Sequence, residues 1–267
     1  MVERADTLRA RCLCLDIETA RQDRNALREL GVFRPDQGVR LRISASARDL
    51  VSRLDAVTEG AAFVLGHNII AFDQPILAQL HPELALHRLP LLDTLALSPV
   101  AFPQNPYHRL VKDYKLCSTT RNDPAQDAEL AYALFLDQHA ALRARVAEHP
   151  DEALCLHFLL SQENGKGVAN LFATLRRSLR PTLVQVAEAW QRATEGKVCR
   201  TAQRRVVEDW LPDPAWHPPL AYVLAWLRVL RGRPRQGANL PGPLLFQGCI
   251  AGLRCLARWR PASRTSR

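Results

Sequence analysis

Segments with strand character alternate with segments of helical spacing over about residues 8–140 of the 267-residue chain, and this alternation constrains the fold most. Strands are predicted at 11–18, 26–34, 39–44, 61–65 and 89–92, with a turn containing Pro35 and Gly38 between the second and the third. Helices are predicted at 47–57, 73–80, 106–116 and 124–139. Strands that alternate with helices indicate an α/β domain in which helices flank a central sheet.

The pattern becomes purely helical after residue 148 and changes again after residue 231. One apolar helical face is formed by Val168, Leu171, Phe172, Leu175 and Leu179. Pro181 is predicted to end that helix, and a second apolar stripe follows it. We therefore expect a small helical annex over residues 148–230. Residues 231–267 are rich in Arg, Gly and Pro, which predicts a basic, disordered tail.

The formal net charge of +9 comes entirely from the end of the chain. Asp213 is the last acidic residue, and nine of the 36 basic residues follow it, all of them arginines. The residues before them carry 27 basic and 27 acidic side chains and therefore have no net charge. A basic chain often binds nucleic acid, but this charge does not indicate that the α/β domain does so.

The seven cysteines are scattered and include no pair of C-x-x-C units, which argues against a structural zinc site. Cys12 and Cys14 alternate along the first predicted strand, so we expect both to be buried on one face. No apolar run is long enough to span a bilayer, and the N-terminal residues lack the pattern of a secretory signal. We expect a cytoplasmic protein with reduced thiols and no membrane partner.

Asp16 and Glu18 stand at the end of the first predicted strand. Side chains two positions apart share a face, so both carboxylates point the same way while Leu13, Leu15 and Ile17 face the opposite side. Two neighbouring anions repel, and their burial is costly unless cations balance them. A metal site and two solvated acids at a strand end both fit this motif when it is taken alone.

The loop after the fourth predicted strand leads to a third acid. Asp73 opens a helix after the sequence G-H-N-I-I-A-F, which begins at Gly66. Asp is a favoured N-cap, and a capping carboxylate can still offer an oxygen to a metal. Asp93 occupies a similar position within L-D-T-L but lacks the preceding H-N and F-D context, so we assign it the capping role alone.

The last predicted helix of the α/β domain presents a fourth acid. Asp123 and Pro124 are favourable residues for the N-cap and the first helical position. Asp127 then aligns with Ala131 and Leu134, which places its carboxylate on an apolar, inward-facing stripe. An unpaired inward acid is costly, and a cation partner would offset that cost.

The D-x-E at 16–18, the H-N and F-D at 67–73 and the late helix with Asp127 follow the order of the three exonuclease motifs of the DEDD superfamily. The chain resembles this DnaQ-like superfamily over about residues 10–140. The spacing between Asn68 and Phe72 is similar to that in proofreading domains of family-B DNA polymerases. The segments D-T-L-A-L and Y-H-R-L-V-K-D-Y-K-L resemble exonuclease-like domains that precede RecQ-type helicases. The resemblance implies a ribonuclease H-like fold with a central mixed sheet for residues 8–145.

The resemblance also implies a 3′–5′ exonuclease that removes nucleotides from a nucleic-acid 3′ end. Its catalytic residues and metal ligands would be Asp16, Glu18, Asp73 and Asp127, which would hold two divalent cations, Mg²⁺ or Mn²⁺. Residues expected to contact the substrate are Thr19, His67, Asn68 and Phe72. The expected partner is a single-stranded 3′ end, of DNA rather than RNA. A helicase is a further candidate, as a partner or as a lost fusion.

One position departs from the family pattern. Family members carry a His five residues before the last Asp, or a Tyr four residues before it, whereas this chain has Asn122 and Asp123 there. Asn cannot accept a proton near neutral pH, so Asp123 and His108 are the other candidates for a base or an orienting group.

Three functions stay open at this point. They are an active exonuclease, a weak or inactive nucleic-acid-binding module from a helicase fusion, and a protein that binds a partner through residues 148–230.

Overall fold

The structure is a computed structural model that describes residues 10–20, 22–23, 26–105, 123–161 and 166–229. The predicted helix at 106–116, with His108, lies outside the described residues, as do Asn122 and the predicted tail.

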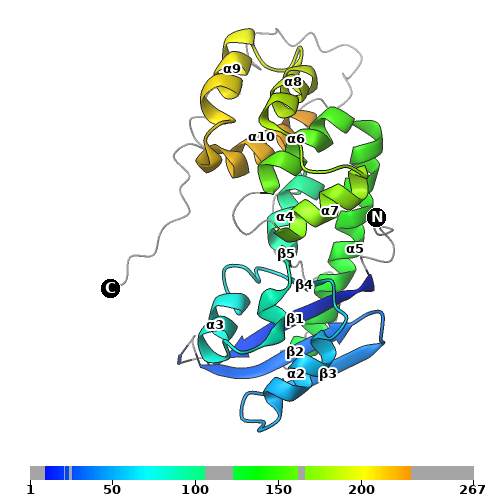
Figure 1. Cartoon of the computed structure of the whole chain (residues 1–267), viewed down its shortest axis with the longest axis vertical. Helices are drawn as coiled ribbons and strands as arrows, with labels where there is room; N and C mark the ends of the chain where they lie inside the picture. The colour runs from blue at the N-terminus through cyan, green and yellow to red at the C-terminus, as the bar shows by residue number, and fades with distance from the viewer. Residues whose placement is uncertain (1–9, 21, 24–25, 106–122, 162–165, 230–267) are drawn as a thin grey trace.

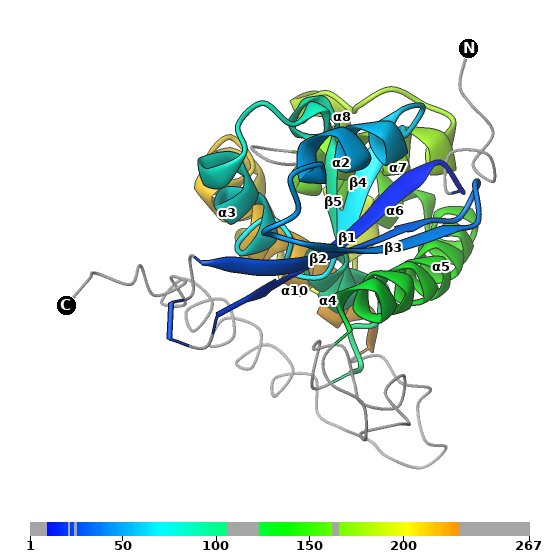
Figure 2. The ribbon, with the colours of Figure 1, turned by 90° about the horizontal axis from the view of Figure 1, so that it is seen from below.

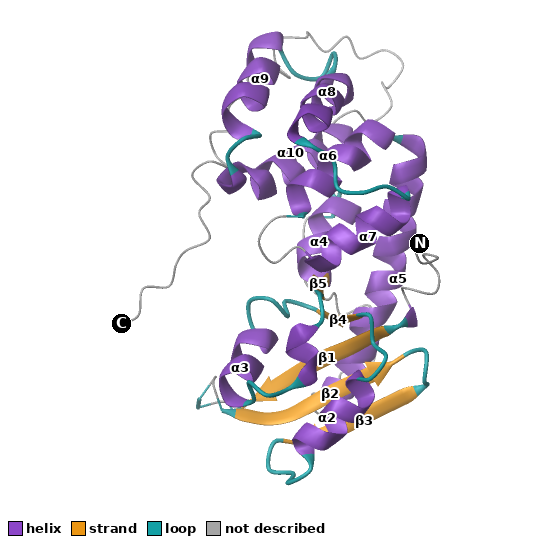
Figure 3. Cartoon of the chain, in the orientation of Figure 1, coloured by secondary structure: helices purple, strands orange, loops and turns teal. Residues whose placement is uncertain are grey.

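A five-stranded mixed sheet forms the centre of the α/β part, as the sequence predicts (Figure 3). Its strands are β1 (Cys12–Thr19), β2 (Leu27–Arg34), β3 (Val39–Ser44), β4 (Phe63–Gly66) and β5 (Leu91–Asp93). They are arranged in the order β3-β2-β1-β4-β5. The strands β1, β2 and β3 pair antiparallel, whereas β4 pairs parallel with β1 and β5 parallel with β4. This arrangement places β1 at the centre of the sheet.

Helices flank the sheet and extend beyond one of its ends (Figure 1). The first helices of the chain are α2 (Leu50–Thr58), α3 (Asp73–Leu80), the 3₁₀ helix η1 (Ala85–Arg88) and α4 (Thr94–Ala101). They are followed by α5 (Pro124–Glu148), α6 (Pro150–Leu160), α7 (Lys166–Arg176) and α8 (Leu183–Thr194). The last are α9 (Arg200–Arg205), the π-helix η3 (Val206–Trp210), the 3₁₀ helix η4 (Pro214–Trp216) and α10 (His217–Val229). Among the described residues, no helix has the length and apolar character of a membrane span.

The helix α5 is longer than predicted. It continues past residue 139 to Glu148, because Pro150 is the next residue that cannot continue a helix. The added turns also bury Leu142 and Arg145. One helix therefore spans both the α/β part and the start of the predicted annex.

The strand β1 separates two apolar cores, one on each face of the sheet. Figure 2 shows α2 on one side of the sheet and α5 on the other. Leu13, Leu15 and Ile17 belong to the core beneath α2 and α3. Cys12 and Cys14 face the opposite core, on the side of α5, where both are fully buried with their Sγ atoms 3.4 Å apart. Burial raises the pKa of the Cys14 thiol. The predicted alternation along this strand and the predicted burial of both cysteines are confirmed.

The helices after α5 share the second core with the sheet. Leu156 of α6 and Trp190 of α8 belong to the same buried cluster as Leu65 of β4. The helix α7 comes so close to β5 that a Cβ atom at Gly167 would lie 2.0 Å from the carbonyl oxygen of Leu91. The helical region from 148 onwards therefore packs against the sheet through a continuous apolar core.

The helix α7 ends earlier than predicted. It buries Phe172, as the apolar stripe predicts, but it ends at Arg176, and Leu179 is 85% exposed. Arg177 adopts a φ of 51°, in the left-handed region that ends helices. The prediction that the helix continues to Pro181 is therefore wrong, since the chain leaves the helical conformation before it reaches this proline.

Candidate metal centre at β1 and α5

Three of the four predicted ligands meet at one place. Asp16 and Glu18 lie on β1, and Asp127 lies in the first turn of α5. One carboxylate oxygen of each lies within 4.8 Å of the other two. All three side chains are partly buried. Asp16 and Glu18 lie on the same face of β1 as Cys12 and Cys14. The helix α5, which carries Asp127, covers this face.

Gly31 of β2 explains how α5 comes so close to the sheet. It lies directly opposite Asp16 in the strand register. A Cβ atom at this position would lie 1.8 Å from the carbonyl carbon of Pro124 and 2.1 Å from the backbone nitrogen of Ala125. Only a residue without a side chain allows this approach. The sequence analysis missed Gly31, although a glycine within a strand often marks the close approach of another backbone.

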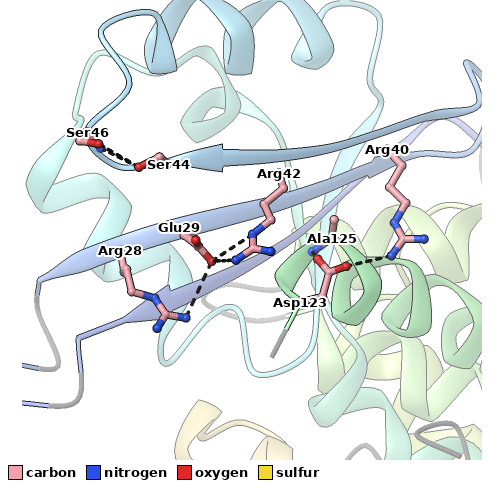
Figure 4. Close-up of polar contacts among 8 residues, drawn as sticks. All are labelled: Arg28, Glu29, Arg40, Arg42, Ser44, Ser46, Asp123 and Ala125. Atoms are coloured by element: carbon pink, nitrogen blue, oxygen red, sulfur yellow. Dashed lines mark hydrogen bonds and ion pairs between the residues drawn. The ribbon is translucent and has the colours of Figure 1, made fainter. Parts of the chain in front are cut away.

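Asp123 fixes the start of α5. Its side chain accepts a hydrogen bond of 3.1 Å from the backbone of Ala125, which confirms the predicted N-cap. Arg40 of β3 donates to the same carboxylate at 3.2 Å (Figure 4). Arg40 also lies 3.3 Å from Glu129. These contacts give Asp123 a structural role, because they tie the beginning of α5 to the edge of the sheet.

Asp73 lies beside the three clustered acids. The pairing of β1 with β4 ends at Cys14, and further along β1 the backbone N–H of Ile17 donates to Oδ1 of Asp73 at 2.9 Å. The side chain of Asp73 is thus bound to the β1 backbone at the residue between Asp16 and Glu18 in the sequence, although Asp73 is not part of the 4.8 Å group. The predicted N-cap role is wrong, since Phe72 is the N-cap of α3 and the Asp73 carboxylate reaches β1 instead.

The burial of Asp73 changes its acidity. The residue is 2% exposed, and desolvation raises its pKa to about 7. The charges of Asp93 and Glu18 act in the same direction, while the hydrogen bond from Ile17 opposes them. A buried carboxylate of raised pKa is a group that a neighbouring cation would stabilise, because the cation favours the charged form.

Asp93 holds the loop between β4 and α3 in place. Its side chain accepts a hydrogen bond from the backbone of Leu95, which confirms the predicted capping role. It also accepts hydrogen bonds from the backbone of Asn68 at 2.8 Å and of Ile70 at 3.2 Å. Asn68 adopts a φ of 67° within this turn. The buried carboxylate of Asp93 therefore holds the backbone of the loop that precedes Asp73 at two positions.

The other residues predicted to contact a substrate are His67, Phe72 and Thr19. Nδ1 of His67 lies 2.9 Å from the hydroxyl of Thr94, and burial lowers the pKa of this imidazole. Phe72 packs against the core beneath α2 and α3. Thr19 ends β1, just beyond an irregularity in its register at Glu18. Contacts of these residues with a substrate stay predictions.

Asp16, Glu18 and Asp127, together with the neighbouring Asp73, are called the acidic site. The acidic site offers the type of ligand that a hard divalent cation prefers. Its side chains offer carboxylate oxygens, which Mg²⁺, Mn²⁺ and Ca²⁺ prefer as ligands. The three clustered acids would repel one another when charged, and a cation would relieve this repulsion.

Comparison of the chain with protein-family models, curated proteins and solved structures found no match.

Proposed function

We propose that this protein is a metal-dependent 3′–5′ exonuclease with a ribonuclease H-like fold. The convergence of Asp16, Glu18 and Asp127 within 4.8 Å is the observation that carries the proposal. The buried Asp73 lies beside them, so the four acids on which the DEDD resemblance depends occupy one region of the fold. The strand order, with an antiparallel hairpin beside parallel strands, supports the proposed fold.

The proposed cofactors are two divalent cations, Mg²⁺ or Mn²⁺, and the carboxylates of the acidic cluster are suitable ligands for such ions. Asp16, Glu18 and Asp127 would hold them, and Asp73 would complete the set from its position against Ile17. When bound at such a site, divalent cations supply a nucleophilic hydroxide at neutral pH and stabilise the charge that develops on the phosphodiester oxygens.

The chain's own residues position this acidic set. Gly31 admits the start of α5, and the cap at Asp123 places Asp127 in the first turn of the helix. The backbone of Ile17 holds the carboxylate of Asp73 against β1. Because the acids are carried by a central strand and two helices, they are arranged before a substrate arrives.

A nucleic-acid-binding module without turnover is the second candidate. Position 122, where DEDD exonucleases place a general base, holds Asn. The neighbouring Asp123 is engaged by Ala125 and Arg40. Such a module would bind a cation and a polynucleotide through the same face but would release no nucleotides.

Degradation of end-labelled DNA tests the proposal. The full chain is incubated with 3′-labelled and 5′-labelled single-stranded DNA in Mg²⁺ or Mn²⁺, and RNA is run in parallel. Asp16→Ala removes one clustered acid. Asp49→Asn is the matched control, because Asp49 is 62% exposed and precedes α2 on the opposite side of the sheet.

We expect early loss of the 3′ label and progressive shortening of the 5′-labelled strand. Asp16→Ala and chelation by EDTA abolish both, while Asp49→Asn retains them. If neither DNA nor RNA is degraded, the exonuclease proposal is wrong. A cation-induced rise in melting temperature that Asp16→Ala removes would then favour the binding module.

A further inference from the structure

Figure 4 shows a second charged cluster, formed by side chains of β2 and β3. Arg42 of β3 donates through Nε and Nη2 to Oε2 of Glu29 at 3.1 and 2.6 Å. Nη2 of Arg28 lies 3.8 Å from the same oxygen. We call Arg28, Glu29 and Arg42 the arginine cluster. Two guanidinium groups share one carboxylate, so the cluster carries a net positive charge.

The strand register places this cluster beside the clustered acids. Glu29 lies directly opposite Glu18 of β1. Arg42 lies opposite Gly31, which in turn lies opposite Asp16. Residues paired in this way project from the same face of a sheet, and neighbouring strands are about 4.8 Å apart. Glu29 and Arg42 are therefore one and two strands away from the acids, on the same face. Arg28 joins them through its contact with Glu29.

The guanidinium groups of the cluster can bind a further anion. The side chains of Arg28 and Arg42 are 54% and 46% exposed. A guanidinium has five N–H donors, and Arg42 engages Glu29 through Nε and Nη2 only. Arg40 differs, because it lies between the two acids Asp123 and Glu129, which exceed its charge.

We propose that the arginine cluster binds a backbone phosphate of the strand whose 3′ end is held at the acidic site. The inference rests on the proposed function, since that function brings a polynucleotide to this face. A single strand carries one negative charge for each nucleotide, and a guanidinium binds phosphate oxygens in a bidentate manner. Glu29 holds the two arginines in place before the strand binds and competes with phosphate for them.

The salt dependence of binding tests this proposal. Binding of a fluorescent single-stranded oligothymidylate to the full chain is measured in EDTA at several salt concentrations. Arg42→Gln is compared with Arg53→Gln, which removes a charge of similar exposure from α2 on the other face of the sheet. The nine arginines that follow Asp213 are common to all variants and cancel in the comparison.

Loss of one phosphate contact lowers the slope of log affinity against log salt by about 0.7 for a single strand. We expect this decrease for Arg42→Gln and no decrease for Arg53→Gln. Arg42→Lys retains the charge and the slope. Glu29→Gln removes the competing carboxylate and strengthens binding at low salt.

Equal slopes for wild type, Arg42→Gln and Arg53→Gln would overturn the proposal, as would an absence of oligothymidylate binding by the wild-type chain. The measurement requires no metal and no turnover, so it is independent of the nuclease assay. A reduced slope in a chain that degrades no DNA or RNA would retain the phosphate site but reject the exonuclease. Nuclease activity with unchanged slopes would reject the phosphate site alone.

Discussion

Gly31 of β2 lies directly beneath Pro124 at the start of α5, with room for a hydrogen atom but not for a methyl group. This contact connects the two elements that carry the clustered acids, because Gly31 lies opposite Asp16 and Pro124 precedes Asp127 by three positions. The separation of the carboxylates across the site therefore depends on a residue that is not itself a ligand.

Gly31→Ala is expected to weaken cation binding without removing any ligand. The added methyl group displaces the start of α5, and overpacking of this kind destabilises a protein by about 1–3 kcal/mol. We expect a smaller rise in melting temperature on addition of Mn²⁺ than in the wild type. Thermal unfolding with and without Mn²⁺ measures both effects.

Gly38→Ala is the matched control for this variant. Gly38 has a φ of 64°, so the substitution strains the β2–β3 turn, but no atom lies within 4 Å of the added Cβ. It should lower the melting temperature and leave the Mn²⁺-induced shift unchanged. If Gly31→Ala retains the full Mn²⁺ shift, the contact with Pro124 does not control the site.

Asp73→Asn is expected to stabilise the protein in EDTA above neutral pH. Raising the pKa of Asp73 from 3.8 to about 7 means that the folded state binds this proton more tightly than the unfolded state. Stability is therefore lost as pH rises from about 4 to 7, by on the order of 2–4 kcal/mol for a shift of this size. Asn has no proton to lose, so the variant escapes this loss.

The same substitution should remove most of the stabilisation by Mn²⁺, because it deletes a proposed ligand. Urea unfolding at pH 5 and pH 8, in EDTA and in Mn²⁺, separates the two effects. In EDTA the advantage of Asp73→Asn over the wild type should grow between pH 5 and pH 8. A constant difference at both pH values would show that the Asp73 carboxylate is not responsible.

The strands and the acids of β1 could be predicted because their signals are local. Alternation of Leu13, Leu15 and Ile17 with Asp16 and Glu18 determines which side chains share a face, whatever the rest of the fold. The capping sequence around Asp123 is equally local and places the start of α5 within one residue. These two signals account for the three acids that the structure brings together.

The remaining features depend on contacts between residues distant in the sequence. The bond between Asp73 and Ile17 joins residues 56 positions apart, and a local pattern favours Asp73 as an N-cap instead. The importance of Gly31 becomes visible only when α5 is placed on β2. The end of α7 depends on the backbone conformation of Arg177, which apolar spacing does not indicate.

His157 should make the helical part sensitive to acid. Its imidazole is buried, stacks on Phe172, and has Nδ1 2.7 Å from a nitrogen of Arg176. Desolvation, together with the charges of Arg176 and Arg180, lowers its pKa from 6.5 to about 4. The folded state therefore disfavours the proton, and stability present above pH 6.5 is lost as pH falls towards 4.

In His157→Gln, the loss of unfolding free energy as pH falls from 6.5 towards 4 should be smaller by about 1–3 kcal/mol. This holds whatever the effect of the substitution on stability at pH 7. The exposed His149→Gln is the control. Urea unfolding between pH 7 and pH 4 measures the slope for each variant. An unchanged slope in His157→Gln would assign the acid sensitivity to other groups.

Glu152→Gln tests whether the helical region and the sheet unfold together. Arg145 of α5 is 5% exposed, donates to the carbonyl oxygen of Val100 in α4, and lies 3.4 Å from Oε1 of Glu152 in α6. Removing the carboxylate leaves a buried guanidinium without its counter-charge, which costs about 3–5 kcal/mol. Asp151→Asn breaks the exposed pair with Arg192 and should cost at most about 1 kcal/mol.

The shared core predicts that this loss appears in a single transition. Apolar residues of β4, α6 and α8 belong to one buried cluster, so exposing α6 also exposes one face of the sheet. Circular dichroism should therefore show one cooperative melt, shifted to lower temperature, for Glu152→Gln. An annex that folds independently would instead give two transitions, of which only one moves, and the sheet would retain its Mn²⁺-induced stabilisation after the annex has melted.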